Sequence, residues 1–255
     1  MQGQNFDNYV SDYRKVESKQ LKISGADSFY FSEYKVLELK KRLNNRKISN
    51  ILDLGCGDGS SAVFLNKYFP EAKIFGVDIS IESIRSADGK NIPNSFFCQY
   101  DGNAIPFSSD FFDLVFISCV LHHVPVQIHY NLVKECYNVL QKKGIICVFE
   151  HNPYNIFTRL IVNGCVFDRN SVLVSALHIK KILFKSCFKN LKIRYTIFFP
   201  RFFIFKLFVF FERYLHLIPL GCQYYILADK WFYIVKAIKI WSILLYRCII
   251  IVLYY

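Results

Sequence analysis

Residues 51–59, ILDLGCGDG, decide the fold of this chain. A short apolar run ends in a turn with three glycines, and an amphipathic segment, Ser60–Tyr68, follows it. This order predicts a buried strand, a tight turn and a helix, because glycine permits a sharp bend and lets a ligand lie against bare backbone. The spacing is GxGxG, and Asp53 precedes the first glycine by two positions. An acid at that point suits a ligand with a cationic ammonium group and disfavours the pyrophosphate of a dinucleotide.

Strands and helices alternate along the chain around this turn. Apolar runs predict strands over 51–54, 73–77, 95–99, 113–118 and 145–150, amphipathic runs predict helices over 60–68, 81–87 and 127–140, and Lys143-Gly144 predicts a turn. This alternation predicts an α/β fold with a Rossmann-like, doubly wound, mostly parallel sheet. Beyond residue 150 we expect helices over 172–188 and 201–217 and strands over 191–199 and 221–227. The two late strands would complete a seven-stranded sheet with an antiparallel edge strand.

The sequence divides into three parts. We expect residues 1–45 to form an N-terminal helical cap with a break at 24–28. We expect residues 46–230 to form the α/β domain and residues 231–255 to form an apolar tail. The basic residues of the tail, Lys236, Lys239 and Arg247, share an arc of about 80° on a helical projection. The tail therefore predicts a helix with one basic stripe, which suits an anionic membrane surface and not a transmembrane span. Docking on the protein's own sheet, dimerisation and an incidental extension of little order are the three alternatives.

The charge of the chain is unevenly distributed. Residues 1–150 hold 17 Lys/Arg and 17 Asp/Glu, whereas residues 151–255 hold 15 Lys/Arg and 3 Asp/Glu, a net charge of +12. This asymmetry favours an anionic partner, such as a membrane surface, an acidic or phosphorylated substrate, or nucleic acid. The nine cysteines include no CxxC pair, so we expect neither a disulfide scaffold nor a metal site. No secretory signal is visible, and we expect a cytoplasmic protein, peripheral at the inner face of the membrane.

Two more acids follow the next two strands. Asp78 ends the second strand, 23 residues after Gly55, and Asp101 follows the third. Because the carboxyl ends of parallel strands meet at one edge of a sheet, Asp53, Asp78 and Asp101 should lie together there. The three acids predict a binding site for a nucleoside that carries a positively charged amino-acid arm. Asp78 would accept hydrogen bonds from the ribose hydroxyls, and Asp101 would accept one from the exocyclic amine of the purine. The alternative is that Asp53 caps a helix and the others are turn residues.

The segment 51–149 resembles the class I S-adenosylmethionine-dependent methyltransferases of the small-molecule type. The resemblance runs through ILDLGCGDGSSAVFL, GVDIS, CQYDGNAIPFSSDFFDLVFISCVLHHV and LVKECYNVLQKKGIICVFE, and segments such as EHNPYN and VFDRN are similar to a narrower bacterial subgroup. The resemblance implies S-adenosyl-L-methionine as the cofactor. The cofactor-binding residues that it implies are Asp53, Gly55, Cys56 and Gly57 in the glycine turn, Asp78 and Ile79 at the ribose and adenine, Asp101 and Gly102 at the adenine edge, and Ser118 beside the methionine.

Methyl transfer is an in-line displacement at a sulfonium carbon, so the protein mainly aligns donor and acceptor. A base is needed only if the nucleophile starts protonated, and the candidate catalytic residues are His123, His122 and Glu150. We expect a small-molecule or lipid-linked acceptor. A non-catalytic cofactor-binding or regulatory module is one alternative. A nucleic-acid methyltransferase is another, although no DPPY- or NPPY-like segment follows the fourth strand to hold a flipped base.

Overall fold

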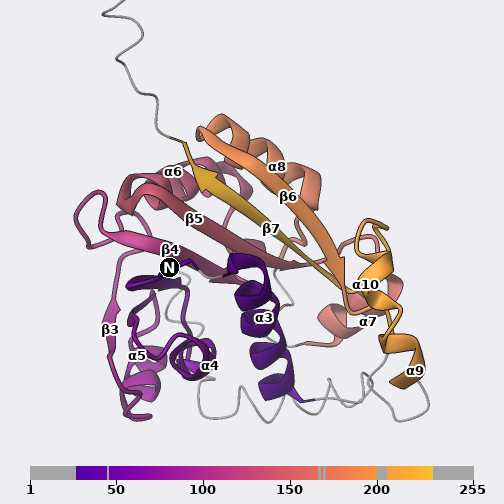
Figure 1. The fold of residues 1–255 in the computed structure, drawn as a ribbon, viewed down its shortest axis with the longest axis horizontal. Helices are drawn as coiled ribbons and strands as arrows, with labels where there is room; N and C mark the ends of the chain where they lie inside the picture. The colour runs from indigo at the N-terminus through magenta and orange to yellow at the C-terminus, as the bar shows by residue number, and fades with distance from the viewer. Residues whose placement is uncertain (1–26, 45, 166–167, 169–170, 200–205, 232–255) are drawn as a thin grey trace, which may run out of the picture.

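A seven-stranded sheet forms the centre of the computed structural model, which describes residues 27–44, 46–165, 168, 171–199 and 206–231 (Figure 1). The strands, in the order β3-β2-β1-β4-β5-β7-β6, are β1 Asn50–Leu54, β2 Lys73–Asp78, β3 Ser95–Gln99, β4 Phe112–Ser118, β5 Leu140–His151, β6 Phe188–Thr196 and β7 Gln223–Lys230. Strands β1 to β5 pair in parallel, and β7 pairs antiparallel with both β5 and the edge strand β6. The predicted Rossmann-like sheet with an antiparallel edge is therefore confirmed.

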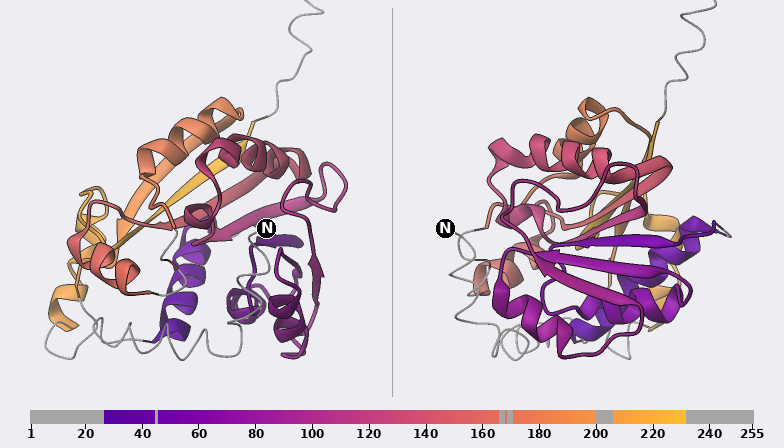
Figure 2. Two further views of the ribbon diagram at one scale, coloured as in Figure 1. Left: turned by 180° about the vertical axis from the view of Figure 1, so that it is seen from behind. Right: turned by 90° about the vertical axis from the view of Figure 1, so that its left-hand side faces the viewer.

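Helices cover both faces of this sheet (Figures 1 and 2). They are α3 Ser28–Leu43, α4 Ser60–Tyr68, α5 Ile81–Asp88, α6 His129–Val139, α7 Ile156–Gly164, α8 Ala176–Lys185, α9 Lys206–Val209 and α10 Glu212–Leu215, with 3-10 turns η2 Leu121–His123 and η3 Val126–Ile128. Alternate residues of a strand face opposite sides, so Leu52 packs in one core with α6 and α8, whereas Ile51 packs in the other with α3 and α4. The glycine turn is thus anchored by a strand that is buried on both faces.

The first half of the chain follows the prediction closely. Helix α4 and strand β3 have the predicted bounds, and the helix predicted over 127–140 is α6, preceded by η3. The predicted turn at Lys143-Gly144 is wrong, because β5 begins at Leu140 and runs through it. Lys143 nevertheless has a left-handed backbone, with φ at 67°, and the register of β4 against β5 shifts there. The turn chemistry at this position therefore produces a bulge instead of a strand end.

The C-terminal part departs further from the prediction. The helix expected over 172–188 is shorter, because Ser175 caps α8 and Phe188 already opens β6. The helix expected over 201–217 consists, in its described part, of the short helices α9 and α10. The Glu212 carboxylate accepts hydrogen bonds from the backbone N–H groups of Phe198 and Phe199, at 2.8 and 3.1 Å. Helix α7 was not predicted. It begins at an Asn155 cap in the segment after β5.

The two predicted outer parts are described only partly. Helix α3 is the described part of the N-terminal cap, and its cap residue Asp27 lies within the predicted break at 24–28. Residues 1–26 and the tail helix predicted over 231–255, apart from Trp231, lie outside the described residues. Among the described residues, no helix is both long and apolar enough to cross a bilayer.

Candidate active site

The glycine turn between β1 and α4 borders open space. Gly55 and Gly57 both have positive φ angles, 72° and 52°. The backbone N–H groups of Gly55 and Cys56 donate to the carbonyl oxygen of Val77, at 2.8 and 3.1 Å, which holds the turn against β2. A Cβ atom at Gly55 would lie 2.5 Å from the side chain of Val120, whereas one at Gly57 would meet nothing within 4 Å. Gly57 therefore forms the wall of a space that a ligand can fill.

Two of the predicted acids lie at this turn. Asp53 is 1% exposed, and within the described part of the chain its Oδ2 atom has no hydrogen-bond partner. Burial and the nearby charge of Asp78 raise the pKa of Asp53 to about 7, although Lys35 acts against them. The Asp78 carboxylate accepts hydrogen bonds from the N–H groups of Gly57 and Ser80, both at 2.9 Å. The fold thus leaves a buried carboxylate oxygen that a ligand cation would satisfy.

The third acid lies in the loop after β3. The N–H of Tyr100 donates to the carbonyl oxygen of Asp78 at 3.0 Å, so this loop starts beside the end of β2. Asp101 is exposed, and its Oδ1 atom accepts from the N–H of Asn103 at 2.8 Å. That hydrogen bond is the main reason why the pKa of Asp101 lies below its usual value. Gly102 is adjacent to Ile79, since a Cβ atom there would lie 3.5 Å from the Ile79 side chain. The Asp101 carboxylate therefore stabilises the turn in which it lies. Ile79 and Gly102 lie next to each other.

A lysine that sequence reasoning missed reaches the same edge of the sheet. Lys35 of α3 is 8% exposed, and its Nζ atom lies 3.0 Å from both the Oγ atom of Ser118 and the Sγ atom of Cys119. Phe31 and Leu39, one turn before and one turn after it, are both buried. A charge within the apolar stripe of a helix was the sequence signal that should have identified this residue.

Cys119 follows β4 with a φ angle of 57°, in the left-handed region. Burial opposes the thiolate form, but the charge of Lys35 and a hydrogen bond from His151 outweigh it and lower the pKa of Cys119 to about 7. By contrast, burial raises the pKa of Cys56 in the glycine turn. Cys119 is therefore a cysteine in a cationic setting, the condition that makes a thiol reactive.

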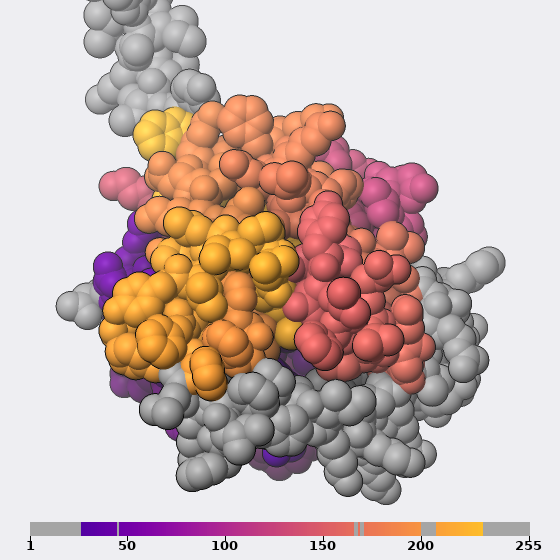
Figure 3. Space-filling model, turned by 90° about the vertical axis from the view of Figure 1, so that its right-hand side faces the viewer, coloured from indigo at the N-terminus to yellow at the C-terminus, as the bar shows by residue number. Residues whose placement is uncertain are grey.

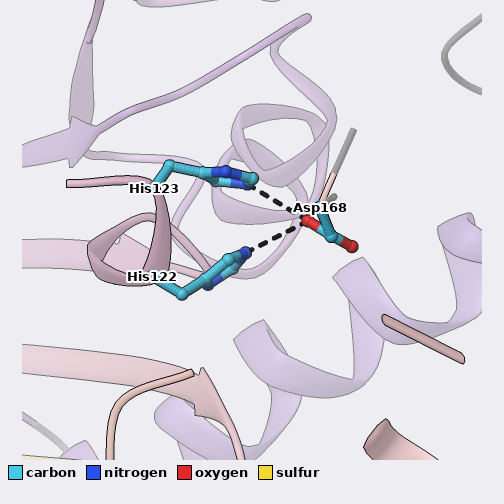
Figure 4. Close-up of side chains that lie close together, drawn as sticks. All are labelled: His122, His123 and Asp168. Carbon is cyan, nitrogen blue, oxygen red and sulfur yellow. Dashed lines mark ion pairs between the residues drawn. The ribbon is translucent and has the colours of Figure 1, made fainter. Parts of the chain in front are cut away.

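The three predicted catalytic residues lie together at the carboxyl ends of β4 and β5. Glu150 is fully buried, and its two carboxylate oxygens lie 2.7 Å from the N–H of Leu121 and 2.7 Å from the Nδ1 atom of His122. Asp168, which was not predicted, joins them. Its Oδ1 atom lies 3.4 Å from the Nε2 atoms of both His122 and His123 (Figure 4). Only three acids occur after residue 150, and that scarcity was the signal that could have pointed to Asp168.

The electrostatics of this cluster separate the two adjacent histidines. Although burial opposes it, the carboxylates of Glu150 and Asp168 raise the pKa of His122 to about 10. Burial and the charge of His122 lower the pKa of His123 to about 4. Burial is likewise outweighed at Glu150 and Asp168, where the histidines lower both pKa values to about 2. The His123 side chain is 22% exposed, against 2% for His122, so His123 is the ring that a substrate can reach.

A cavity of about 310 Å³ lies on the far side of residues 172–175, and none of the cluster residues lines it. Pro153 and Tyr154, which follow β5, line it together with residues 172–175. The N–H of Val172 donates to the carbonyl oxygen of His122 at 2.9 Å, so this wall is tied to the cluster. The volume suits a small molecule. A second cavity, of about 520 Å³, lies between α6 and α8, and like the first it is lined by none of the predicted site residues.

Comparisons with known proteins place the glycine turn and the strands that follow it in a described family. Residues 51–144 match the family described as "Methyltransferase domain". Trans-aconitate 2-methyltransferase of Escherichia coli O1:K1 is 34% identical over 135 residues, which are 52% of this chain and 52% of that enzyme. The chain thus spans about half the length of the curated relatives that it matches.

Solved structures share the fold over a longer stretch. A SAM-dependent methyltransferase of Thermotoga maritima, described as a possible histamine N-methyltransferase, aligns with a TM-score of 0.65 at 18% identity and covers 90% of this chain and 100% of its own. Phosphoethanolamine N-methyltransferase 2 of Haemonchus contortus, solved in complex with S-adenosyl-L-methionine, aligns with a TM-score of 0.63 at 17% identity, over 89% of this chain and 60% of its own. At these identities the likeness is one of fold.

Proposed function

We propose that this chain, whose residues 51–144 match a methyltransferase domain, is a class I S-adenosylmethionine-dependent methyltransferase that transfers the methyl group of S-adenosyl-L-methionine to a small-molecule acceptor. The observation that carries this proposal is the convergence of Asp53, Gly57 and Asp78 at one edge of the sheet. There a buried carboxylate oxygen without a partner lies beside a turn that borders open space. When bound, the cofactor supplies an already activated methyl group, so the protein needs only to hold and align the reactants.

The residues at this edge fit the amino-acid arm of the cofactor. That arm carries one cation and one anion, and the site offers Asp53 and Lys35, two buried groups of opposite charge. We assign Asp53 to the ammonium and Lys35 to the carboxylate. Gly55, Cys56, Gly57 and Ser118 would surround the methionine, Asp78 would bind the ribose hydroxyls, and Ile79, Asp101 and Gly102 would bind the adenine.

The histidine cluster lies on the acceptor side of this assignment. Glu150 fixes the ring of His122 through its Nδ1 atom, and the partly exposed His123 lies beside it, with ring centroids 4.1 Å apart. His123 would contact the acceptor, whereas His122 and Glu150 would hold the His123 ring in position. The acceptor would occupy the cavity of about 310 Å³ between the segment after β5 and residues 172–175. In this assignment residues 46–230 form the catalytic domain and α3 closes it with Lys35.

Calorimetry followed by turnover tests the proposal. S-adenosylhomocysteine should bind the full chain, and Asp53→Asn should weaken binding, while Asp88→Asn, an exposed acid at the end of α5, should not. Turnover with methyl-labelled cofactor is then assayed on trans-aconitate, the acceptor in the name of the E. coli relative, and on metabolite extracts. No binding would contradict the whole proposal. Binding without methylation of any extract would favour the non-catalytic module.

A membrane-bound or amphiphilic acceptor is a second candidate, favoured by an exposed apolar face. Helix α7 and the α9–α10 segment lie beside each other on this face (Figure 3). Its exposed side chains include Ile156, Phe157, Leu160, Phe208, Phe210, Phe211, Tyr214, Leu217 and Leu220. Apolar groups of this size, on a half of the chain with a net charge of +12, suit the interface of an anionic bilayer.

Flotation with liposomes tests this second candidate. The full chain is compared with a chain ending at Lys230 and with the double variant Ile156→Ser, Phe157→Ser, on neutral and anionic vesicles at low and high salt. Binding should require anionic lipid and weaken with salt, because each basic residue near the surface contributes about 1 kcal/mol. Loss on truncation would assign the contact to the tail, and loss in the double variant would assign it to α7. A full chain that stays off all vesicles contradicts the candidate.

A further inference from the structure

Two histidines and a carboxylate of this chain converge on one point. We propose that His122, His123 and Asp168 form a binding site for one divalent transition-metal ion of the Zn²⁺ type. One ligand atom of each residue lies within 4.8 Å of the others. Among the described residues, this is the one group of three histidine, cysteine or acidic side chains close enough to share a metal ion. Both imidazole rings point at the same carboxylate oxygen (Figure 4). No metal site was expected from the sequence, because its nine cysteines include no CxxC pair.

The distances match those of a tetrahedral metal site. The Oδ1 atom of Asp168 lies 3.4 Å from the Nε2 atoms of both His122 and His123. Ligand atoms placed about 2.1 Å from a tetrahedral Zn²⁺ lie about 3.4 Å apart. A direct N–H···O hydrogen bond is usually 2.7–3.2 Å long, so both contacts are long for a hydrogen bond, although the one from His122 still lowers the pKa of Asp168. The two distances to Asp168 therefore match those around a shared central ion, and the ligand atoms of the two histidines lie within 4.8 Å of each other.

A buried carboxylate already orients one ligand. Glu150 lies 2.7 Å from the Nδ1 atom of His122, which turns the Nε2 atom of the same ring toward Asp168. Metal-binding histidines commonly donate their other ring N–H to a carboxylate in this way, which fixes the tautomer and the direction of the ring. The two rings are also packed against each other, with centroids 4.1 Å apart. Glu150 is thus a positioning residue for the site.

The segment that carries Asp168 is held in place by its backbone. The N–H of Asp168 donates to the carbonyl oxygen of Cys165, at 3.2 Å, and the N–H of Ser171 donates to the carbonyl oxygen of Asp168, at 2.9 Å. The N–H of Val172 then donates to the carbonyl oxygen of His122, at 2.9 Å. These hydrogen bonds place the carboxylate beside the two rings without help from an ion.

The donor set indicates the class of ion. Two imidazole nitrogens and one carboxylate oxygen suit Zn²⁺ and similar transition ions, whereas Mg²⁺ and Ca²⁺ prefer oxygen ligands alone. Three protein ligands leave a fourth position, which in zinc proteins is filled by water or by a substrate oxygen. The side chains of His123 and Asp168 are 22% and 15% exposed, so that position has access to solvent. The inference stands on this geometry and does not depend on the proposed methyl transfer.

Titration of the full-length protein, freed of metal with a chelator, tests the site. Zn²⁺ is followed by calorimetry, and Co²⁺ by the visible absorption of a tetrahedral complex. We expect one saturable ion per chain, a rise in melting temperature with Zn²⁺, and roughly tenfold or greater weakening in His123→Ala, in Asp168→Ala and in the orienting variant Glu150→Gln. His178→Ala is the matched control, because His178 pairs with His129 at 3.2 Å outside the proposed group.

The possible outcomes separate the explanations. Melting curves without metal identify any variant that fails to fold, and the partly exposed His123 and Asp168 are the variants that decide. Saturable binding lost in both confirms the site. No saturable binding overturns it and leaves the cluster as an ion-pair network. A sulfur-to-cobalt charge-transfer band, or binding unchanged in His123→Ala and Asp168→Ala, also overturns it and assigns the ion to a cysteine such as Cys119. Cofactor affinity measured on the same samples reports on the proposed function separately.

Discussion

The Nζ atom of Lys35 lies 3.0 Å from the Sγ atom of Cys119, and this contact joins helix α3 to the end of β4. Helix α3 precedes the alternating strands and helices and was predicted only as a cap. Through Lys35 it instead contributes a buried cation to the edge where Asp53 lies, and that charge acts on both the carboxyl and the thiol. The cap is therefore part of the site.

Cys119 should be alkylated readily near neutral pH. Because Lys35 and His151 outweigh burial and bring the pKa of Cys119 to about 7, the rate should rise with pH and level off above that value. Burial raises the pKa of Cys56 and Cys98, which should react more slowly at pH 7. Iodoacetamide labelling over pH 5.5–9, read by peptide mass spectrometry, gives the profile.

The variant Lys35→Met tests whether the Lys35 charge causes the low pKa of Cys119. Removing the cation should move the Cys119 profile to higher pH and slow labelling at pH 7. Lys40→Met is the matched control, since Lys40 lies on the same helix but is exposed and contacts the Phe69 ring. An unchanged profile in Lys35→Met would show that His151 alone sets the reactivity.

Asp78→Ala should weaken cofactor binding by about 1.5–3 kcal/mol, which is roughly 10- to 150-fold in the dissociation constant. The expected cause is the loss of charge-assisted hydrogen bonds to the ribose. Asp78 also accepts from the N–H groups of Gly57 and Ser80, so melting curves must show that the turn remains folded. Calorimetry with S-adenosylhomocysteine is the measurement. Equal affinity in a folded Asp78→Ala variant would contradict the ribose assignment.

Gly57→Val should abolish cofactor binding while the sheet stays folded. Gly57 has a φ of 52°, so any side chain strains the backbone by about 1–2 kcal/mol, but its Cβ atom meets nothing of the protein. Gly57→Ala carries the same strain with less bulk and is the matched control. We expect both variants to melt alike and the valine to bind far more weakly, because its branches enter the cofactor space. Normal binding by Gly57→Val would show that the turn is not the cradle.

Local patterns predicted the fold where local chemistry decides it. Helix α4 and strand β3 matched residue for residue. A glycine turn starts the helix and Pro70 follows its end, while the strand is an apolar run between Ser95 and Gln99. The segment 201–217 failed for the opposite reason. Its apolar residues fit a helix, yet the Glu212 carboxylate accepts hydrogen bonds from the backbone of Phe198 and Phe199, a contact that the apolar periodicity of the segment does not reveal.

The candidate site was predictable in the same uneven way. The carboxyl-edge rule places Asp53 and Asp78 at the glycine turn, since both lie at the carboxyl ends of parallel strands. Lys35 and Ser118 are 83 positions apart, and their contact depends on how α3 packs against the sheet. Asp168 likewise reaches His122 only through the packing of the segment between α7 and α8. Contacts between distant segments carry no local pattern, so those two residues emerged only from the fold.

The raised pKa of Asp53 links cofactor binding to pH. Burial and the charge of Asp78 bring this pKa to about 7, so much of the carboxyl is neutral below that pH. A cofactor ammonium favours the ionised form, so binding should release a proton. Affinity should therefore fall toward about tenfold per pH unit below pH 7 and level off above it. Calorimetry at pH 5.5–7.5, in buffers of different ionisation enthalpy, measures both the affinity and the proton.

The stability of the protein without cofactor should respond to pH in the opposite direction. A carboxyl whose pKa is raised on folding stabilises the folded state fully below its unfolded pKa of 3.8, and that contribution is lost as pH rises through about 7. Asp53→Asn removes the titrating group and should raise the melting temperature at pH 8 relative to the unchanged protein. The same variant should lose the proton release and bind S-adenosylhomocysteine weakly at every pH. If proton release persists in Asp53→Asn, the linkage belongs to Cys119, which titrates in the same range.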